Sequence, residues 1–472
     1  MRFAFTIVSL SVIALNLSAQ TNTQNLPKPA AQTAAQSVSP LKDVAVPAKI
    51  DTLISAYAAL NQFNGTILVT QGANTIFRKV YGYRDAEKKI KLGADDLFQL
   101  GSLTKSFTSI LIMQLIEEKK LSLDNKLTDF FPAIHPEKMI TIAQLLNHTS
   151  GIREELRDPA FRAKVRAGKE VTRQEMLDYY SHQPLDFEPG STFAYSNSGY
   201  NLLGMIIEKL RGLSYEQVIR QRIFHLLGMT GSGFNYPRLK SKYKTKGYAY
   251  LSPTRIVPAT VWAASGSYSS GALYSNARDL ALWNKALKDN KLITAYSLEK
   301  TYTAVKGGYG YGWFIDSLYG KKIVSHAGNV EGGTSYFARI PADDICIIML
   351  INQTSTTLEN IGDKLIALLY GRDYKLPKPK QAIPLSDEMG AKFAGVYDIS
   401  DDYRTTISYA DHQLFLTTNK QPAVRILPES ATRFFINDSD MVLTFSRNAE
   451  GKVHLAIREG LWNGSGDKMD LQ

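Results

Sequence analysis

Cysteine is almost absent from this sequence, which has 472 residues and a single cysteine, Cys346. One cysteine cannot form a disulfide within its own chain, and it cannot supply the ligands of a cysteine-based zinc or iron–sulfur site. A chain of this length can bury a hydrophobic core large enough to fold without disulfides or structural metal sites. Cys346 lies in an apolar segment, so we expect it only to pack there.

Several motifs that mark common enzyme classes are also missing. No Gly-x-Ser-x-Gly occurs, which disfavours the nucleophile turn of an α/β-hydrolase. Neither a phosphate-binding loop ending in Gly-Lys-Ser/Thr nor a Gly-x-Gly-x-x-Gly fingerprint is present, so nucleotide cofactors lack support. There is no His-Glu-x-x-His, and the seven histidines are scattered along the chain. The sequence therefore predicts no cofactor and no metal site.

The composition is that of a globular protein with a moderate basic excess. Hydrophobic residues make up 44% and charged residues 21%, and the length suggests about two to four domains. There are 55 Lys plus Arg against 44 Asp plus Glu, a formal net charge of +11. Such an excess is compatible with nucleic acid, with an anionic surface or with no specific partner.

The first 19 residues, MRFAFTIVSLSVIALNLSA, have the pattern of a secretory signal peptide. Arg2 gives a basic start, Phe3–Leu15 is apolar, and Leu17 and Ala19 fit the −3 and −1 positions of a cleavage site. The apolar run is too short to span about 30 Å of hydrocarbon, and no cysteine near the cut can carry a lipid. We therefore expect an exported protein, periplasmic or secreted, with no stable membrane insertion and no nucleic-acid partner.

The chain divides by composition into five segments. Residues 1–19 are the signal peptide, and residues 20–48, rich in Gln, Ala, Thr, Pro and Ser, predict a flexible leader. Residues 49–374 alternate strands and helices, which predicts an α/β (α+β) domain: an antiparallel sheet flanked by helices, with an inserted helical lobe. Three prolines mark residues 375–387 as a stiff linker, and residues 388–472 predict a small all-β domain.

Hydrophobic periodicity and turn residues predict the individual elements. In the larger domain we expect a strand pair within 65–85, helices at 102–120, 141–147, 199–211, 274–288 (with Ser275 as N-cap) and 358–370, and strands at 311–316, 321–326, 334–340 and 344–351. In the β-domain we expect strands at 393–400, 404–417, 423–436, 441–447 and 452–458, with a turn at 410–412.

Ser102 and Lys105 are the first candidates for chemistry. In Ser102-Leu103-Thr104-Lys105 the two side chains are three residues apart at the start of a helix, so they share one face. A serine hydroxyl becomes a useful nucleophile when a neighbour takes its proton, and a partly desolvated lysine at a helix N-terminus has a lowered pKa. Alone, the pair fits a capping serine with an exposed lysine better than a catalytic site.

Two further motifs change that interpretation. Tyr195-Ser196-Asn197 lies within DFEPGSTFAYSNSGYNLLG, and His326-Ala327-Gly328 lies within VSHAGNVEGGTSYF. With Ser-x-x-Lys, Tyr-x-Asn and Lys/His-x-Gly in this order, residues 48–372 resemble the serine β-lactamase and penicillin-binding-protein superfamily, in its class C β-lactamase and DD-peptidase branch. The flanks FQLGSLTKSFTS, QLLNHTSGI, FHLLGMTGSGF and SGALYSNARDLALWNKAL are similar to that branch as well.

The resemblance implies a role for each motif residue. Ser102 would be the acylated nucleophile, Lys105 would deprotonate it or tune its neighbour, and Tyr195, with a pKa lowered by Lys105, would shuttle protons. Asn197, His326 and Gly328 would bind substrate, with Gly328 leaving room along the strand edge. The backbone amides of Ser102 and Asn329 would form the oxyanion hole.

The third motif departs from the Lys-Thr-Gly of β-lactamases. His326 is expected to be neutral at pH 7 and Ala327 has no hydroxyl, so both anchors for a substrate carboxylate are weakened. The resemblance therefore implies a serine hydrolase that cleaves an amide or ester, with D-amino-acid peptides as the leading class and cell-wall material as one source. A class C-type β-lactamase, a short-chain esterase and a non-catalytic wall- or ligand-binding protein are the alternatives. Oligomeric state is left open.

Two other clusters have structural as well as functional interpretations. The basic run between residues 238 and 246 falls where the family has the mouth of its cleft, so it could attract an acidic substrate. A solvent-exposed loop or edge strand with alternating basic residues explains the run better. The aromatics Tyr309, Tyr311 and Trp313 are expected to pack rather than to bind ligand. The β-domain shows no triad or metal set, and packing or substrate gating is its expected role.

Overall fold

The computed structural model describes residues 45–135, 137–355, 357–400, 403–418, 423–436, 441–459 and 462–469. The predicted signal peptide and most of the predicted leader lie outside these residues. Helix α1 (Val46–Ala59) begins inside the predicted leader, so residue 48 is too late a boundary. Pro47 stands in its first turn, where a missing N–H costs no hydrogen bond. None of the described helices is long and apolar enough to span a membrane.

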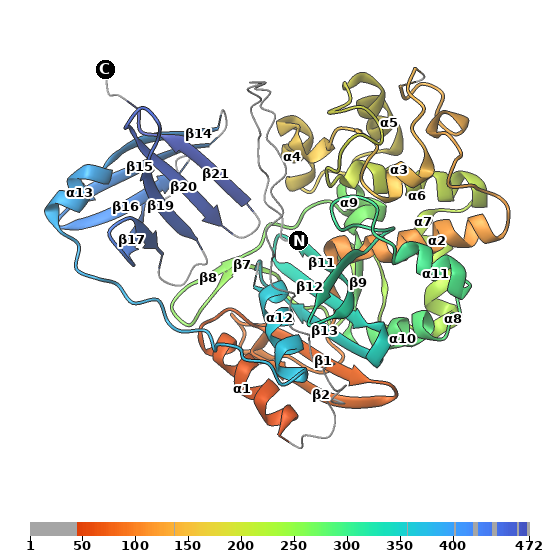
Figure 1. The fold of residues 1–472 in the computed structure, drawn as a ribbon, viewed down its shortest axis with the longest axis horizontal. Helices are drawn as coiled ribbons and strands as arrows, with labels where there is room; N and C mark the ends of the chain where they lie inside the picture. Colours follow the sequence, from red (N-terminus) through yellow and green to blue (C-terminus); the bar gives the residue numbers. More distant parts are fainter. Residues whose placement is uncertain are drawn as a thin grey trace, which may run out of the picture.

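A six-stranded antiparallel sheet with the strand order β10-β11-β12-β13-β1-β2 forms the centre of the larger unit (Figure 1). Its strands are β1 (Gly65–Gln71), β2 (Asn74–Tyr81), β10 (Phe314–Leu318), β11 (Lys321–Val330), β12 (Gly333–Ile340) and β13 (Ile345–Ile351). Strands far apart in sequence are neighbours here, because β1 pairs with β13 in the register Ile67↔Met349. Every residue of β13, including Cys346, is buried, as the apolar sequence predicts for a central strand.

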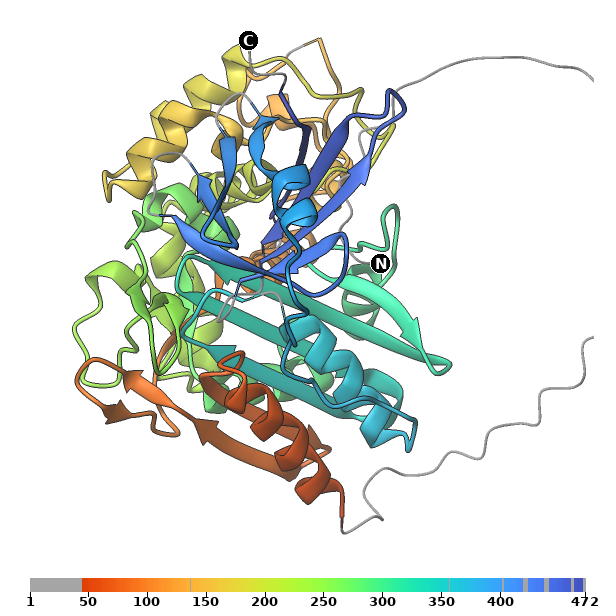
Figure 2. The same ribbon diagram turned by 90° about the vertical axis from the view of Figure 1, so that its left-hand side faces the viewer.

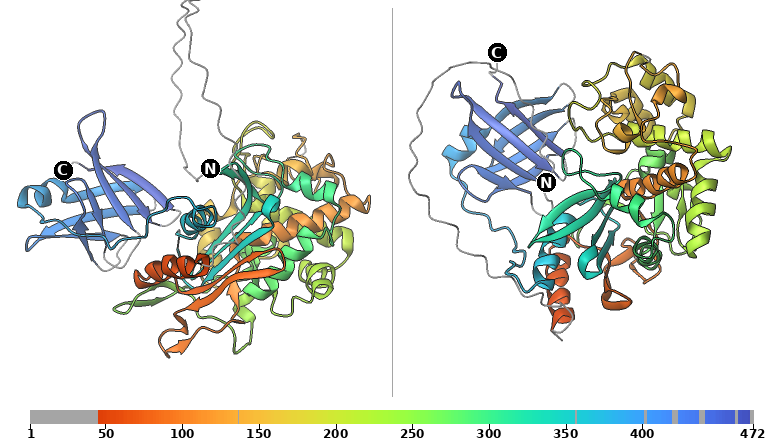
Figure 3. Two further views of the ribbon diagram at one scale, coloured as in Figure 1. Left: turned by 60° about the horizontal axis from the view of Figure 1, so that its bottom comes forward. Right: turned by 45° about the vertical axis from the view of Figure 1, so that its right-hand side comes forward.

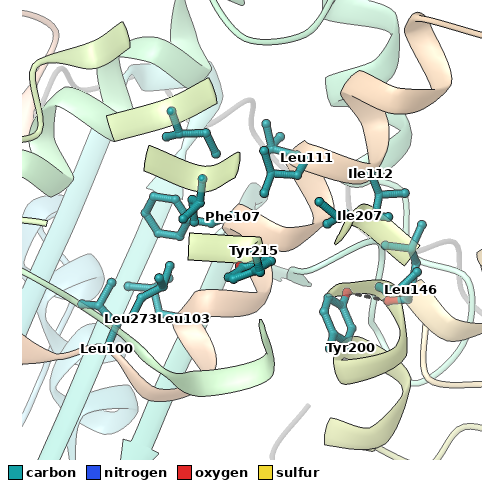
Figure 4. Packing of buried hydrophobic residues seen from close by; sticks show 14 of the residues in the cluster. Leu100, Leu103, Phe107, Leu111, Ile112, Leu146, Tyr200, Ile207, Tyr215 and Leu273 are labelled. Atoms are coloured by element: carbon teal, nitrogen blue, oxygen red, sulfur yellow. Dashed lines mark hydrogen bonds between the residues drawn. The ribbon is translucent and has the colours of Figure 1, made fainter. Parts of the chain in front are cut away.

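Each face of this sheet has its own core. Helices α1 and α12 (Leu358–Leu369) lie side by side over one face (Figure 2). Helices α2 (Thr104–Glu117) and α10 (Ala277–Lys288) pack on the other face, which continues into the helical lobe. Figure 4 shows this second core, where Phe107 of α2 lies among leucines and Tyr215. Tyr200 donates a hydrogen bond to the Leu146 carbonyl at 2.7 Å, so the hydroxyl of this buried tyrosine has a hydrogen-bond partner inside the core.

The inserted lobe lies between β2 and β10 in sequence and packs beside the sheet (Figures 1 and 3). Its helices are α3 (Ile142–Leu146), α4 (Pro159–Arg166), α5 (Arg173–His182), α6 (Asn197–Arg211), α7 (Tyr215–Ile219), α8 (His225–Leu227), α9 (Ala264–Gly271) and α11 (Ala295–Thr301). Its short strands are β3 (Tyr83–Asp85), β4 (Ile90–Lys91), β5 (Phe98–Gln99), β6 (Gly233–Phe234), β7 (Tyr248–Leu251), β8 (Ile256–Pro258) and β9 (Leu273–Ser275). Single helical turns are η2 (Gly101–Leu103), η3 (Leu127–Asp129), η4 (Glu155–Arg157), η5 (Arg220–Phe224) and η6 (Tyr236–Arg238), with η7 (Pro341–Asp343) before β13.

A separate all-β domain follows the linker, as predicted (Figure 3). Helix α13 (Asp387–Phe393) precedes β14 (Gly395–Ser400), β15 (Tyr403–Ala410), β16 (Gln413–Thr418), β17 (Val424–Pro428), β18 (Arg433–Phe435), β19 (Val442–Arg447), β20 (Val453–Glu459) and β21 (Trp462–Asp467). Each strand pairs with the next, and Met469 N donates to Val396 O at 2.8 Å, which brings the last strand back to the first. The predicted fold class is therefore confirmed for both units.

Some local predictions were wrong at their edges. Helix α10 is capped by Asn276, whose Oδ1 accepts from Asp279 N at 2.8 Å, because Ser275 belongs to strand β9. Strand β10 starts only at Phe314, so the aromatics before it pack from a turn, with Tyr309 and Trp313 fully buried. Helix α13 and strand β21 were not predicted, since both are short and polar.

Candidate active site

Turn η2 places Ser102 directly before helix α2, and Lys105 follows one turn later on the same face. Lys105 is completely buried, with 0% exposure. Its Nζ lies 3.0 Å from Ser102 Oγ, 2.6 Å from Asn197 Oδ1 and 2.9 Å from the carbonyl oxygen of Ser270. The amide and carbonyl oxygens can only accept hydrogen bonds. A neutral amine must therefore give both of its N–H groups to them, which directs its lone pair at the Ser102 hydroxyl.

The environment of Lys105 makes that neutral form accessible. Burial lowers the pKa of Lys105 to about 7, while the nearby charges of Glu154 and Glu155 act in the opposite direction. Near neutral pH both the amine and the ammonium are then populated. The same burial would make an uncompensated ammonium costly, and the two glutamates limit that cost.

Glu154 is a site residue that the sequence did not reveal. Asn197 begins helix α6, and its Nδ2 donates to Glu154 Oε1 at 2.7 Å while its backbone N–H donates to Glu154 Oε2. This double contact fixes the amide so that its oxygen faces Lys105. The only sequence signal was an acidic pair shortly after QLLNHTSGI, which is indistinguishable from a surface pair.

Glu155, the second member of that pair, is fully buried. Asn201 Nδ2 donates to Glu155 Oε1 at 2.7 Å, and Ser198 Oγ contacts Oε2. Burial, with the neighbouring Glu154, raises the pKa of Glu155 to about 8. Glu155, the first residue of η4, ties that turn to helix α6, and its side-chain hydrogen bonds go to α6 and not to Lys105.

Tyr195 lies against the same lysine within a group of aromatic rings. Lys105 Nζ is 4.8 Å from the centroid of its ring, and the His148 ring lies 4.3 Å away on centroids. Burial raises the pKa of Tyr195, although a hydrogen bond with Ser102 acts against that shift. The expected lowering of this pKa is therefore wrong, because desolvation exceeds the effect of a lysine that is itself only partly charged.

His326 lies under the site. It is 1% exposed, and its Nε2 is 3.0 Å from the Tyr309 hydroxyl while its Nδ1 is 2.6 Å from the Ala327 carbonyl. Burial and the charge of Lys105 lower the pKa of His326 to about 3, which agrees with the expected neutral ring. With Nδ1 donating to the carbonyl, Nε2 accepts from Tyr309. In this position the imidazole supports the wall instead of facing the cavity.

Gly328 and Gly101 let strand β11 touch the turn that carries Ser102. A Cβ on Gly328 would come within 1.9 Å of the Leu100 carbonyl oxygen, so the missing side chain makes room for that turn and not for substrate. Gly101 has a φ of 53°, and a Cβ there would lie 2.8 Å from Asn329 N. The backbone of Ser102 thus runs beside Asn329, which is the arrangement that two amides need to share one oxyanion.

A cavity of about 560 Å³ opens at this point. Ser102, Asn197 and Asn329 line it, whereas Lys105, Tyr195 and His326 do not. Two residues of the basic run, Lys244 and Lys246, stand in its wall.

The first member of that run has a structural partner. Arg238 pairs with Glu170 at 2.9 Å, as the structural interpretation expects.

Comparison with known proteins identifies the larger unit. The sequence model of the family described as "Beta-lactamase" matches residues 50–371 of this 472-residue chain. The chain belongs to the beta-lactamase and penicillin-binding-protein superfamily. Members of this superfamily are serine hydrolases that act on amides and esters, and the chain is an enzyme of that class. A second model, "Domain of unknown function (DUF3471)", matches residues 379–463, over most of the β-domain.

Individual relatives of this beta-lactamase-family chain have related names. Penicillin-binding protein 4* of Bacillus subtilis is 29% identical over 437 residues, which cover 87% of this chain and 96% of the relative. The octameric penicillin-binding protein homologue from Pyrococcus abyssi is 26% identical with a TM-score of 0.62, over 89% of this chain and 99% of that one. A D-stereospecific amidohydrolase from Streptomyces sp. is 25% identical with a TM-score of 0.58, over 65% and 94%.

Proposed function

We propose that this chain is an exported serine hydrolase that forms an acyl-enzyme on Ser102 and cleaves an amide or ester bond in D-amino-acid-containing peptides. The observation that carries the proposal is the 3.0 Å contact between Ser102 Oγ and the buried Nζ of Lys105. The predicted signal peptide in residues 1–19 supports export. No cofactor takes part in the proposed chemistry.

In the acylation half, neutral Lys105 takes the proton of Ser102 as Oγ attacks the substrate carbonyl carbon. The negative charge formed on the carbonyl oxygen is stabilised by the backbone amides of Ser102 and Asn329, each worth about 3 kcal/mol in comparable sites. Tyr195 is a neutral phenol in the resting enzyme, since burial raises its pKa, and it gives its proton to the departing nitrogen or oxygen. An ester on Ser102, a charged Lys105 and a Tyr195 phenolate result.

In the deacylation half, water attacks the acyl carbon and gives a proton to the Tyr195 phenolate. The bond to Ser102 Oγ then breaks, and Oγ recovers its proton from Lys105. The ammonium of Lys105 close to the Tyr195 ring stabilises the phenolate between the two halves. Both side chains return to their starting states, so one turnover consumes one water.

The D-peptide assignment is supported by the names of two relatives, a penicillin-binding protein and a D-stereospecific amidohydrolase. An efficient β-lactamase is less supported, because the residue in the third motif is a buried neutral histidine and not an exposed lysine. A non-catalytic binder is less supported because Lys105 is held with its lone pair directed at Ser102.

A labelling experiment followed by a substrate panel tests the proposal. A fluorophosphonate or a labelled penicillin is expected to modify the wild-type protein and to leave Ser102→Ala unmodified. The panel contains D-Ala-D-Ala peptides, D-amino amides, short esters and nitrocefin, and we expect the D-configured amides or peptides to be hydrolysed fastest. Labelling that survives Ser102→Ala would falsify the assignment of Ser102 as the nucleophile. Nitrocefin as the best substrate would establish the alternative, a β-lactamase. Absence of turnover with tight muropeptide binding would establish a binding protein.

A further inference from the structure

The cavity beside Ser102 has a wall that no motif residue provides. The segment from Ala259 to Ala263, between β8 and α9, forms this wall together with residues from α4, η4 and β9. Its apolar lining residues are Leu156, Val165, Val261, Trp262, Ala264 and Leu273. Together these side chains present an aliphatic and aromatic surface to anything bound at Ser102.

Hydrogen bonds fix this wall in place at both ends. Ala259 N donates to Gly247 O at 3.0 Å, and Ala263 N donates to Val165 O at 2.9 Å. Between them, Glu331, directly after β11, accepts hydrogen bonds from Thr260 N and from Trp262 Nε1, each at 2.9 Å. The indole is therefore held in one orientation before any ligand arrives, which reduces the entropy cost of binding.

Each charged side chain among the described cavity-lining residues already has a partner. Lys246 pairs with Glu87, and Lys244 Nζ donates to the Pro237 carbonyl at 3.0 Å. Glu331 accepts the two bonds from the wall and lies 3.6 Å from Arg166 Nε.

These contacts engage the charged groups with the protein itself, so the wall offers a ligand mainly its apolar side chains.

The position of Tyr195 separates this cavity from the leaving group. Tyr195 is the proposed proton donor to the leaving group, and neither it nor its ring neighbours His148, Tyr309 and Phe314 line the cavity. Ser102 and Asn197 do line it. The part of the substrate that fills the cavity is then the part that stays on Ser102 after the leaving group departs.

We propose that the Ala259–Ala263 wall and its neighbours form a subsite for an apolar side group on the acyl part of the substrate, of aromatic or branched aliphatic size. This inference rests on the proposed function, because it assigns the acyl side of a bond cleaved by Ser102. It narrows the substrate class to amides and esters whose acyl part carries a hydrophobic side group.

A series of p-nitrophenyl esters with one leaving group and three acyl groups tests the subsite. With the full chain we expect kcat/KM for the phenylacetyl ester to exceed that for the acetyl ester about 30-fold or more, and to exceed that for the succinyl ester as well. In Trp262→Ala the preference for phenylacetyl over acetyl is expected to fall below about fivefold. In the control Tyr296→Ala, an exposed ring on α11, the preference stays as in the wild type.

A second variant covers the case in which Trp262→Ala does not fold. Val261 is 64% exposed, so Val261→Glu places a negative charge at the cavity without disturbing the core, and it is expected to lower the phenylacetyl rate at least tenfold. Equal rates for the three esters, or a preference for succinyl, would overturn the subsite while turnover itself supports the proposed function. No p-nitrophenol release and no Ser102 adduct in the intact-protein mass would overturn the proposed function, and the subsite with it.

Discussion

Replacing Glu154 with glutamine removes a carboxylate charge from beside Lys105 while keeping a side chain of the same shape. The two groups are joined through the Asn197 amide, with contacts of 2.6 Å to Lys105 Nζ and 2.7 Å to Glu154 Oε1. The side-chain amide oxygen of the new glutamine can still accept one of the two hydrogen bonds that Asn197 donates. The main change is then electrostatic, and the ammonium form of Lys105 loses a stabilising partner.

The size of this effect follows from the geometry. Two unit charges roughly 6 Å apart interact by about 3 kcal/mol at an effective dielectric constant of about 20. Because 1.36 kcal/mol corresponds to one pH unit, the pKa of Lys105 falls by about one to two in Glu154→Gln after screening. The sign is fixed: losing a negative neighbour disfavours the charged amine, so its neutral form persists to lower pH.

The assay is kcat/KM for an activated ester measured between about pH 4.5 and 9, which reports groups of the free enzyme. In the wild type we expect activity to rise with pH through a midpoint near 7, where Lys105 loses its proton. In Glu154→Gln the midpoint is expected near pH 5 to 6, with a plateau reduced less than about tenfold by the lost hydrogen bond.

A matched control is Glu299→Gln, which removes one charge from an exposed glutamate on α11 that pairs with Lys322 at 2.8 Å. Its midpoint is expected to stay at the wild-type value. A midpoint in Glu154→Gln that is unchanged or moves to higher pH would refute the assignment of Lys105 as the group that accepts the Ser102 proton.

Two further variants test the packing around the site. Gly328→Ala is expected to lower kcat/KM about 100-fold, because its Cβ would meet the Leu100 carbonyl at 1.9 Å and displace the Ser102 turn; Gly93→Ala, with its nearest contact at 3.7 Å, is the control. Wild-type activity in Gly328→Ala would contradict this close approach. Burial raises the pKa of Glu155 to about 8, so its stabilising contribution is present at low pH and is lost as pH rises, by up to about 1.4 kcal/mol per pH unit. The melting temperature of the wild type should therefore fall from pH 5 to 8 more steeply than that of Glu155→Gln, and parallel curves would exclude this role.

Local sequence was sufficient to predict most helices and strands and to identify Ser102 and Lys105 as a candidate catalytic pair. The apolar run of β13 and the periodicity of α2 and α12 predicted their type and near limits, because burial on a sheet or helix imposes those patterns. The spacing of Ser102 and Lys105 placed both on one helix face. Edges were less predictable where two elements compete for a residue, as with Ser275 between β9 and α10.

Other parts of the site depended on contacts between distant segments. Glu154 joins Asn197 from 43 residues away, and no local pattern separates it from a surface glutamate. The pKa directions of Tyr195 and Lys105 follow from burial, which needs the whole packed lobe. The lining of the cavity comes from seven separate stretches of chain, so its apolar character is invisible in any one of them.

The sequence by itself determined the absence of a disulfide within the chain, the order of the three motifs and the division into an α+β unit and a β-domain. These properties are local, since they depend on residue identity and periodicity along the chain. Only the tertiary structure decided that Lys105 is buried, that His326 supports the wall from below, and that Gly328 makes room for the Ser102 turn. Burial and close approach are properties of packed neighbours, and those neighbours are brought together only when the sheet and the lobe have folded.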